Sequence, residues 1–301
     1  MMNKLIVFAV IAAVITVGVG IHLLKTPVRE EEWMKEGVLI SGGYCDAEVV
    51  KLDNGIYRMY YGTTPFMYEG KIEILSATST DGLTWENEPG VRLSFGAMPS
   101  VIRLDNRSWR MYYSESGGIC SAISDEDGLE FNDEGLRIAH YNNVQIRSST
   151  AVRLDNGSYR MYYCEDDLGG FAGGQYIRSS ISDNGLTWEK ESGARIDGTQ
   201  APFYALAGGM VDGPDIVKLP NGSFRLYFWS GRSAGSKVEK VDGIYSADSE
   251  DGLNFSNISL ILAQDELGVP SDPSVIQMPD GGWRMYYGLG SEICSAKAGS
   301  I

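Results

Sequence analysis

"NGSYRMYY", residues 156–163, is one of five copies of the same phrase in this chain, and these copies decide the fold. The others are "NGIYRMYY" at 54–61, "NRSWRMYY" at 106–113, "NGSFRLYF" at 221–228 and "GGWRMYY" at 281–287. Asn-Gly tolerates the positive φ of a tight turn, and the aromatic residues after it suit a pleated, packed surface. Each copy therefore predicts a hairpin turn followed by a β-strand.

The residues around each phrase repeat as well. A short apolar run precedes every turn, as in "PSVIRLDNR" at 99–107, and a third run follows the phrase, as in "ICSAIS" at 119–124. In four units a turn closed by an aromatic residue comes next, as in "STDGLTW" at 79–85, and a fourth run ends the unit. With no helical periodicity after residue 30, the pattern predicts an all-β, five-bladed β-propeller of four-stranded antiparallel blades.

The two ends of the chain predict how the ring closes. The fifth unit stops at "ICSAKAGSI", 293–301, and lacks a fourth strand. The segment "EEWMKEGVLIS", 31–41, matches "LTWENEPGVRLS", 83–94, nearly position for position. We therefore expect residues 33–41 to form the outer strand of the last blade, within one propeller domain over residues 29–301, because an unclosed ring would leave both ends as free sheet edges.

Residues 1–28 differ in character from the rest of the chain. Positions 5–24 carry no charge, a length that fits a bilayer-spanning helix and exceeds the usual apolar core of a signal peptide. They predict one N-terminal transmembrane helix, with the propeller outside the cytoplasm as a single-pass protein of the cell membrane. Removal of this segment as a signal peptide, which would release a secreted protein, is the alternative.

Charge and cysteine usage exclude some classes of function. The net charge of -15 repels phosphate backbones, which argues against a nucleic-acid partner. The four cysteines, at positions 45, 120, 164 and 294, show no CxxC pairing, so a zinc site is not expected. Both buried free thiols and disulfides remain compatible with an exported protein.

Candidate site residues come from the windows before each first apolar run, because the innermost strand of a propeller blade lines the central channel. The windows are "YCDAEVV" at 44–50, "GAMPSVI" at 96–102, "IRSSTAV" at 146–152, "VDGPDIV" at 211–217 and "PSDPSVI" at 270–276. They contain five carboxyl groups and one cation: Asp46, Glu48, Asp212, Asp215, Asp272 and Arg147. This set predicts a carboxyl-rich funnel suited to acid–base chemistry.

Other interpretations of the same residues stay open. Asp46 and Asp272 could cap strand starts through their own backbone, and Asp215 could form a structural ion pair with Arg147. A Ca²⁺ ion is possible, because oxygen ligands suit it. Aromatic side chains that could stack on sugars, or equally pack in the core, are Tyr44, Phe203 and Tyr204; the last two lie in a Gly-rich insertion expected to cover the funnel.

The five-blade arrangement and the "STDGLTWE" turns resemble the five-bladed glycoside hydrolase superfamily, which includes family 43 and the invertase–levansucrase group. The resemblance covers the chain after the N-terminal segment. It places Asp46 at the Asp that opens blade one of that family, and Asp212 at the Glu of blade four, where Gly213-Pro214 match a Glu-Gly-Pro motif. Arg147 matches the residue before the middle-blade Asp, but Ser148 stands at the Asp itself.

The resemblance implies a glycoside hydrolase in which Asp46 is the base or nucleophile and Asp212 is the general acid. It implies a carbohydrate substrate and requires neither cofactor nor metal. The residues expected to bind substrate are Arg147, Ser148, Asp215, Asp272, Glu48, Tyr44 and Tyr204. Ser148 cannot supply the charge of the missing Asp, although Asp215, Glu48 or Asp272 could. A non-catalytic surface propeller that binds glycan or protein, or a purely structural one, is therefore the alternative.

Overall fold

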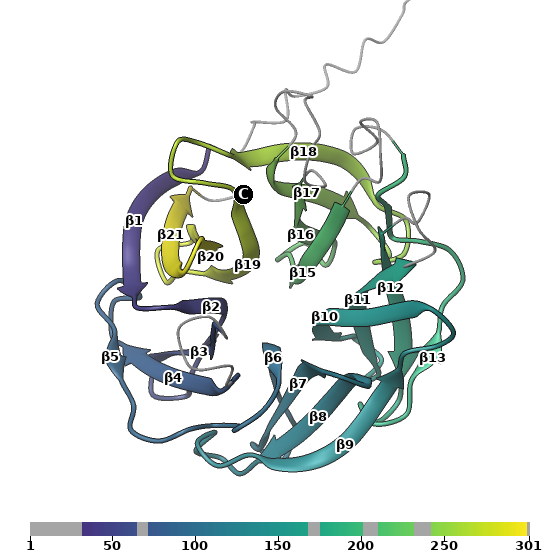
Figure 1. The fold of residues 1–301 in the computed structure, drawn as a ribbon, viewed down its shortest axis with the longest axis horizontal. Coiled ribbons are helices and arrows are strands. Elements are labelled where there is room, and N and C mark those ends of the chain that lie inside the picture. Colours follow the sequence, from purple (N-terminus) through teal and green to yellow (C-terminus); the bar gives the residue numbers. More distant parts are fainter. Residues whose placement is uncertain (1–31, 65–71, 168–174, 201–209, 232–241, 300–301) are drawn as a thin grey trace, which may run out of the picture. The chain divides into compact units, whose positions relative to one another are not determined.

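Each copy of the YRMYY phrase forms the second strand of an antiparallel sheet, as the sequence predicts. The structure is a computed structural model that describes residues 32–64, 72–167, 175–200, 210–231 and 242–299. Within these residues five sheets stand around one axis, which makes the domain an all-β, five-bladed propeller (Figure 1). The expected fold class of this domain is confirmed.

The strands of the five blades follow one another along the chain. Blade one contains β2 (Tyr44–Lys51), β3 (Tyr57–Thr63), β4 (Ile74–Ser79) and β5 (Glu86–Asn87). Blade two contains β6 (Ala97–Arg103), β7 (Trp109–Glu115), β8 (Gly118–Ser124) and β9 (Asn132–Ala139). Blade three contains β10 (Val144–Arg153), β11 (Tyr159–Asp167), β12 (Gln175–Ser182), β13 (Glu189–Lys190) and β14 (Ile196–Asp197).

The last two blades complete the ring. Blade four contains β15 (Met210–Lys218), β16 (Phe224–Gly231), β17 (Gly243–Ser249) and β18 (Ser256–Ala263). Blade five contains β19 (Pro270–Gln277), β20 (Trp283–Leu289), β21 (Glu292–Ala298) and β1 (Met34–Ser41). The innermost strands β2, β6, β10, β15 and β19 contact one another in sequence, and β19 contacts β2. They form the wall of the central funnel.

Closure by the N-terminal strand is confirmed. β1 pairs with β21 in antiparallel register, with Val38 opposite Cys294. Its Glu36 accepts a hydrogen bond from Arg284 Nε at 2.9 Å, just as Glu88 at the end of blade one accepts one from Arg58 Nε at 2.8 Å. The N-terminal strand therefore supplies both the backbone edge and the carboxylate that the fifth unit lacks.

The outer strands of blades one and three differ from the prediction of a continuous fourth strand. β5 and β13 are two residues long, and after each the chain turns through a glycine with positive φ, Gly90 at 89° and Gly193 at 80°. The chain returns to its sheet only through the pairing of Ile74 with Leu93 in blade one and through β14 in blade three. The fourth run of these two blades is therefore divided into two short pairings.

The core of the propeller lies between neighbouring blades and is filled by the repeated phrase. Each phrase buries its Met or Leu completely, together with one or two aromatic rings: the residues are Met59, Met111, Met161, Leu226 and Met285. One apolar cluster joins Tyr227 and Ile244 of blade four to Val275 and Met285 of blade five. Apolar burial thus holds adjacent blades face to face.

The arginine and second tyrosine of the phrase clamp the turn of the next blade. Arg110 Nη1 donates to the carbonyl of Asn184 at 3.1 Å, and Tyr112 Oη donates to the carbonyl of Gly185 at 2.9 Å. The same pair of bonds joins blade one to two, three to four and five to one. Within the described residues, the blade-four phrase contacts the segment before β1 through Tyr227, which packs edge-on against Trp33 with ring centroids 6.0 Å apart.

The cysteines and the N-terminal segment were also subjects of prediction. All four cysteines lie in described residues and are free, so the disulfide alternative is wrong. The predicted transmembrane segment at 1–28 lies outside the described residues, and the boundary at residue 29 stays a prediction. Among the residues that the structure describes, no helix is long and apolar enough to cross a membrane.

The clamp predicts a specific cost for adding one methyl group at its target. Gly185 and Gly222 both have positive φ, 72° and 89°, so Ala costs backbone strain of about 1–2 kcal/mol at either position. A Cβ on Gly185 would also lie 2.8 Å from Arg110 Nη1 and 2.8 Å from Tyr112 Oη, whereas one on Gly222 meets nothing within 4 Å. We expect Gly185→Ala to lower the free energy of unfolding by about 1–3 kcal/mol more than Gly222→Ala in urea titrations. Equal losses would contradict the clamp.

Candidate functional site

A β-bulge in the innermost strand of every blade builds the floor of the funnel. Pairing is interrupted between Cys45 and Glu48 in β2, and at the equivalent place in β6, β10, β15 and β19. One residue of each bulge is left-handed: Asp46 (φ 54°), Met98 (54°), Ser148 (50°), Gly213 (55°) and Asp272 (48°). Bulges redirect side chains, and left-handed non-glycine residues often mark functional sites. These five residues are called the bulge positions below.

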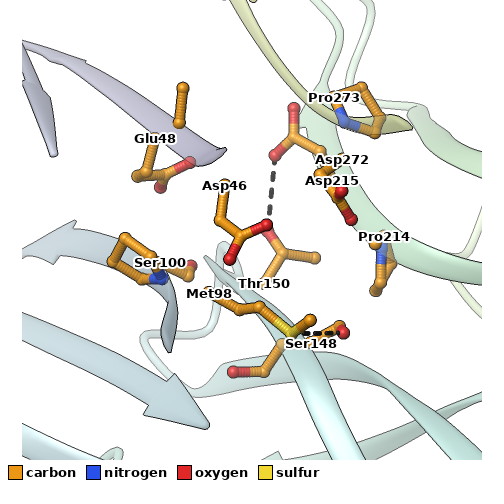
Figure 2. A pocket seen from close by; sticks show the side chains of 14 residues that line it. Asp46, Glu48, Met98, Ser100, Ser148, Thr150, Pro214, Asp215, Asp272 and Pro273 are labelled. Carbon is orange, nitrogen blue, oxygen red and sulfur yellow. Dashed lines mark hydrogen bonds between the residues drawn. The ribbon is translucent and has the colours of Figure 1, made fainter. Parts of the chain in front are cut away.

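The bulge positions face a small common cavity. Its volume is about 40 Å³, and it is lined by Asp46, Glu48, Met98, Ser148, Thr150, Gly213, Asp215 and Asp272 with adjoining backbone and proline rings. Figure 2 shows these side chains directed from all five inner strands toward one space. Of the residues predicted for substrate binding, Ser148, Asp215, Asp272 and Glu48 are thus brought together with Asp46.

Asp46 is a half-buried carboxyl group at the blade-one bulge position. Burial raises its pKa, and the charge of Asp212 raises it further. Hydrogen bonds from the Cys45 thiol, with Sγ 3.4 Å from Oδ2, and from the backbone of Met98 oppose this shift by stabilising the ionised form. Asp46 lies inside β2 and does not cap its start, so the capping interpretation is wrong for this residue.

Asp272 occupies the blade-five bulge position inside β19, so it does not cap a strand start either. Burial raises its pKa to about 8, and the charges of Asp46 and Asp212 contribute to the rise. The indole Nε1 of Trp229 donates to Asp272 Oδ1 at 3.1 Å. A Cβ on Gly213 would lie 2.6 Å from that same oxygen, so only glycine leaves room for the carboxyl group.

Asp212 lies one residue before its bulge position and behind the wall of the cavity. Arg147 Nε donates to Asp212 Oδ2 at 2.9 Å, and the amide of Gly213 donates to Oδ1 at 2.8 Å. The residue is only 4% exposed. Arg147 also donates to Asp166 at 3.0 Å, and Gln175 donates to the same Asp166 oxygen. Sequence reasoning missed Asp166 and Gln175, because they lie in β11 and β12 rather than in an inner strand.

Arg147 is a partly buried cation whose charge is balanced by Asp212 and Asp166. Burial by itself lowers the pKa of Arg147, but the charges of Asp212 and Asp166 outweigh burial and raise it well above its usual range. The guanidinium is therefore a fixed positive charge held between two carboxylates. Arg147 pairs with Asp212 and Asp166 and not with Asp215, so the predicted alternative of an Arg147–Asp215 pair is wrong.

Asp215 and Glu48 belong to a belt of hydrogen bonds that joins the inner strands two residues after each bulge. Glu48 accepts from the amide of Val101 in β6 at 3.0 Å and from the hydroxyl of Ser274 in β19 at 3.2 Å. Asp215 accepts from the amide of Val275 in β19 at 2.7 Å and from Thr150 at 3.4 Å. Both carboxyl groups therefore hold neighbouring blades together, a role that the sequence alone did not indicate.

Met98 and Ser148 form the part of the cavity that carries no charge. Ser148 Oγ donates to Met98 Sδ at 2.9 Å, as Figure 2 shows, and the amide of Ser148 donates to Ser114 Oγ at 2.9 Å. Met98 was missed by reasoning from polar residues, although its position in the second window marks it. The middle blade thus presents a buried hydroxyl where the resembling family has a carboxylate.

A wider cavity opens beside the bulge positions. Its volume is about 370 Å³, and Met98 lines both cavities. Other lining residues include Glu115, His140, Gln145 and Arg147. His140 accepts a hydrogen bond on Nδ1 from the amide of Ile146 at 3.0 Å, so this nitrogen has a structural role. The space is large enough for a sugar ring, whereas the cavity at the axis is not.

The remaining predicted site residues lie elsewhere. Tyr44 packs edge-on against Tyr61, with ring centroids 5.0 Å apart, which matches the packing alternative. Tyr204 and Phe203 lie outside the described residues, together with most of the insertion expected to cover the funnel. Within the described ranges, no group of three or more His, Cys, Asp or Glu side chains is arranged to hold a metal ion.

Comparisons with solved structures identify the fold. The chain is similar to a thermostable family-43 glycoside hydrolase, with a TM-score of 0.69, 18% identity, and coverage of 88% of this chain and 91% of that one. The chain shares the five-bladed fold of family-43 glycoside hydrolases. An endo-arabinase from Bacteroides thetaiotaomicron has a TM-score of 0.65 at 16% identity, over 88% of this chain and 98% of its own. An endo-1,4-beta-xylanase from the same organism has a TM-score of 0.65 at 18% identity, over 87% and 91%.

Searches at the level of sequence give a different result. No protein-family model matches the chain, and no curated protein matches it. At these identities the structural likeness establishes the fold of the family-43 glycoside hydrolases, and the chemistry has to be argued from this chain's own residues.

The belt predicts that the fold loses stability as the pH rises from about 4 to 8. Burial raises the pKa of Glu48 to about 8 and that of Asp215 to about 7, far above the usual value of about 4. The folded state therefore keeps protons that the unfolded chain releases, and this stability is full below pH ~4 and is lost as the pH rises through 7 and 8. We expect the melting temperature to fall over that interval and to fall less steeply in Glu48→Gln. Exposed Glu126→Gln is the control, and an unchanged slope in Glu48→Gln would contradict the assignment.

Proposed function

We propose that the protein is a glycoside hydrolase that cleaves a glycosidic bond at the carboxyl groups of its funnel. One observation supports this most directly. Asp46, Asp212 and Asp272 come from three different blades, yet the charges of the first two raise the pKa of the third. Two of them stand at bulge positions and line one cavity. The fold itself does not require carboxyl groups at the bulge positions, because the other three blades have Met98, Ser148 and Gly213 there.

The cluster provides what glycoside hydrolysis needs. One carboxyl group must be protonated to protonate the leaving oxygen, and a second must be ionised to activate water or attack the anomeric carbon. Groups in close proximity and partly removed from water share protons in this way, since they cannot all ionise together. The sequence-based assignment of Asp46 as base or nucleophile fits the hydrogen bonds that stabilise its ionised form.

The wider cavity supplies space for the substrate. A sugar ring placed there would lie next to Met98 and beside the Arg147–Asp212 pair, with its glycosidic oxygen directed toward the bulge positions. Glu115 and Gln145 offer hydrogen-bonding groups for sugar hydroxyls. The proposal needs no cofactor or metal. With the predicted N-terminal transmembrane helix, this site would face the exterior of the cell, where polysaccharide substrates occur.

A second candidate function is non-catalytic binding of a glycan. Two features favour it. Ser148 carries no negative charge at the position of the middle-blade Asp, and the ion pair with Arg147 engages the carboxylate of Asp212, which the resemblance assigns as general acid. The same cavities would then hold a sugar without hydrolysing it.

Substitution of Asp46 tests the proposed function. Aryl glycosides of pentoses and hexoses, and plant polysaccharides, would be screened with the full chain for release of phenol or reducing sugar. We expect Asp46→Asn to lower kcat/KM by about 100-fold or more on any substrate that is cleaved, because it removes the base or nucleophile. Asp105→Asn is the control, since Asp105 is an exposed carboxylate paired with Arg153.

The screen also separates the two candidates. Equal turnover by Asp46→Asn and the unchanged protein would exclude the funnel as the active site. Sugar binding in calorimetry, without turnover on any substrate, would establish the second candidate in place of the first.

A further inference from the structure

We propose that Asp272 of blade five is the general acid of this site, and that Asp212 is a positioning residue that holds negative charge beside it. This inference rests on the proposed function and changes the assignment of the proton donor. It rests on where the two carboxyl groups stand, what each contacts and which of them reaches the cavity.

The bulge positions select Asp272 over Asp212 as the partner of Asp46. Asp46 and Asp272 are the two carboxylic residues among the five bulge positions, and they come from the adjacent strands β2 and β19. Both line the axial cavity, so both can touch a substrate atom that enters it. Asp212 precedes its bulge position and is not among the lining residues of either cavity.

The contacts of Asp212 suit a permanent charge and not a proton donor. Each of its two oxygens already accepts a hydrogen bond, one from the Arg147 guanidinium and one from the Gly213 amide. Protonation would break the ion pair and leave Arg147 with one carboxylate partner, Asp166. A general acid must give up and regain a proton in every cycle, so this site is poorly suited to the role.

The surroundings of Asp272 keep a proton on it near neutral pH. The ionisable groups that face it are Asp46 and Cys45 from β2 and Asp212 from β15. The charges of Asp46 and Asp212 oppose its ionisation, whereas burial raises the pKa of Cys45 so that it stays an uncharged thiol. Trp229 contributes a neutral N–H donor from β16. Burial and the neighbouring carboxylates therefore outweigh that donor, and the pKa of Asp272 stands at about 8. Near neutral pH Asp272 therefore holds a proton, whereas hydrogen bonds from the Cys45 thiol and the Met98 backbone partly offset the rise in the pKa of Asp46.

The proposed step balances with water as the only co-reactant. Asp272 gives its proton to the glycosidic oxygen, and the bond from that oxygen to the anomeric carbon breaks, with both electrons staying on the oxygen of the departing alcohol. In a single displacement, the oxygen of a water molecule bonds to the anomeric carbon and Asp46 takes its proton. Asp272 is left ionised and Asp46 protonated, and exchange with solvent restores both.

Blade five thereby supplies a carboxyl group that blade three lacks. Ser148 cannot place a charge at its bulge position, and Gly213 leaves the space into which the Asp272 carboxyl group extends. Two observations explain why residue 213 is a glycine. Its φ is 55°, and a Cβ at this position would lie only 2.6 Å from Asp272 Oδ1. The arrangement makes the replacement of the middle-blade Asp compatible with catalysis.

Dependence on the leaving group tests the assignment. Asp272→Asn in the full chain should lower kcat/KM by about 10²–10⁴-fold for unactivated aryl or alkyl glycosides, whose leaving oxygen needs a proton. It should lower kcat/KM little for dinitrophenyl glycosides, whose leaving group departs without one. Asp212→Asn should lower kcat/KM for both kinds of substrate by a similar factor. A loss that depends on the leaving group in Asp212→Asn, and not in Asp272→Asn, would overturn the proposal.

A spectroscopic titration provides a readout that does not need turnover. Because Trp229 donates to Asp272, its fluorescence should change as the pH is raised through about 8. The change should be absent in Asp272→Asn and retained in the exposed control Asp105→Asn. A change that persists in Asp272→Asn, or no change in the unchanged protein, would show that Asp272 does not hold the proton.

The two experiments distinguish this proposal from the proposed function. If no glycoside is hydrolysed but the titration follows Asp272, the hydrolase assignment fails while the protonated carboxyl group stands. If glycosides are hydrolysed with dependence on Asp46 but not on Asp272, the hydrolase assignment stands and the proton donor is another residue. Melting temperatures of all variants would establish that each is folded under the assay conditions.

Discussion

In blades one, two, three and five, an arginine and a tyrosine of the YRMYY phrase donate hydrogen bonds to the turn of the next blade, and the rest of the propeller depends on this contact. The arginine is simultaneously paired with a glutamate at the outer edge of its own blade, as Arg58 is with Glu88. A buried, charged donor that satisfies both a carboxylate and a carbonyl is a strong interaction, and it is directional. Apolar burial brings the blades together, but this clamp sets the angle and offset at which they meet.

The fixed offset between blades brings the bulge positions to a common axis. Each bulge shifts one residue out of the ladder, so its side chain points into the funnel while the strands around it stay paired. The frame repeats, but its five bulge residues do not. Asp46 and Asp272 place carboxyl groups there, Met98 and Ser148 an uncharged contact, and Gly213 leaves room for the Asp272 carboxyl group. The chemistry of the site therefore arises from differences between copies of one structural unit.

The fold was predictable because its signals are local. Asn-Gly turns, alternating aromatic strands and the match of residues 31–41 to 83–94 were enough to predict five blades and the strand that closes them. The site was predictable only in part. The windows identified the carboxyl groups that line the axial cavity. The partners of Arg147 were not evident, since Asp166 and Asp212 approach it from separate strands. The split outer strands of blades one and three were not predicted. A segment that forms two short pairings and one that forms a single long strand have similar amino-acid patterns.

By itself the sequence determined the number of blades, the closure of the ring and the carboxyl groups around the axial cavity. These follow from turn chemistry and strand periodicity, which act over a few neighbouring residues. Only the tertiary structure decided which carboxyl group lines the cavity, which is held in an ion pair and which joins two blades. Asp212, Asp215 and Asp272 look alike in sequence. Burial, neighbouring charges and the direction of each side chain separate their roles, and these properties exist only after the blades have assembled.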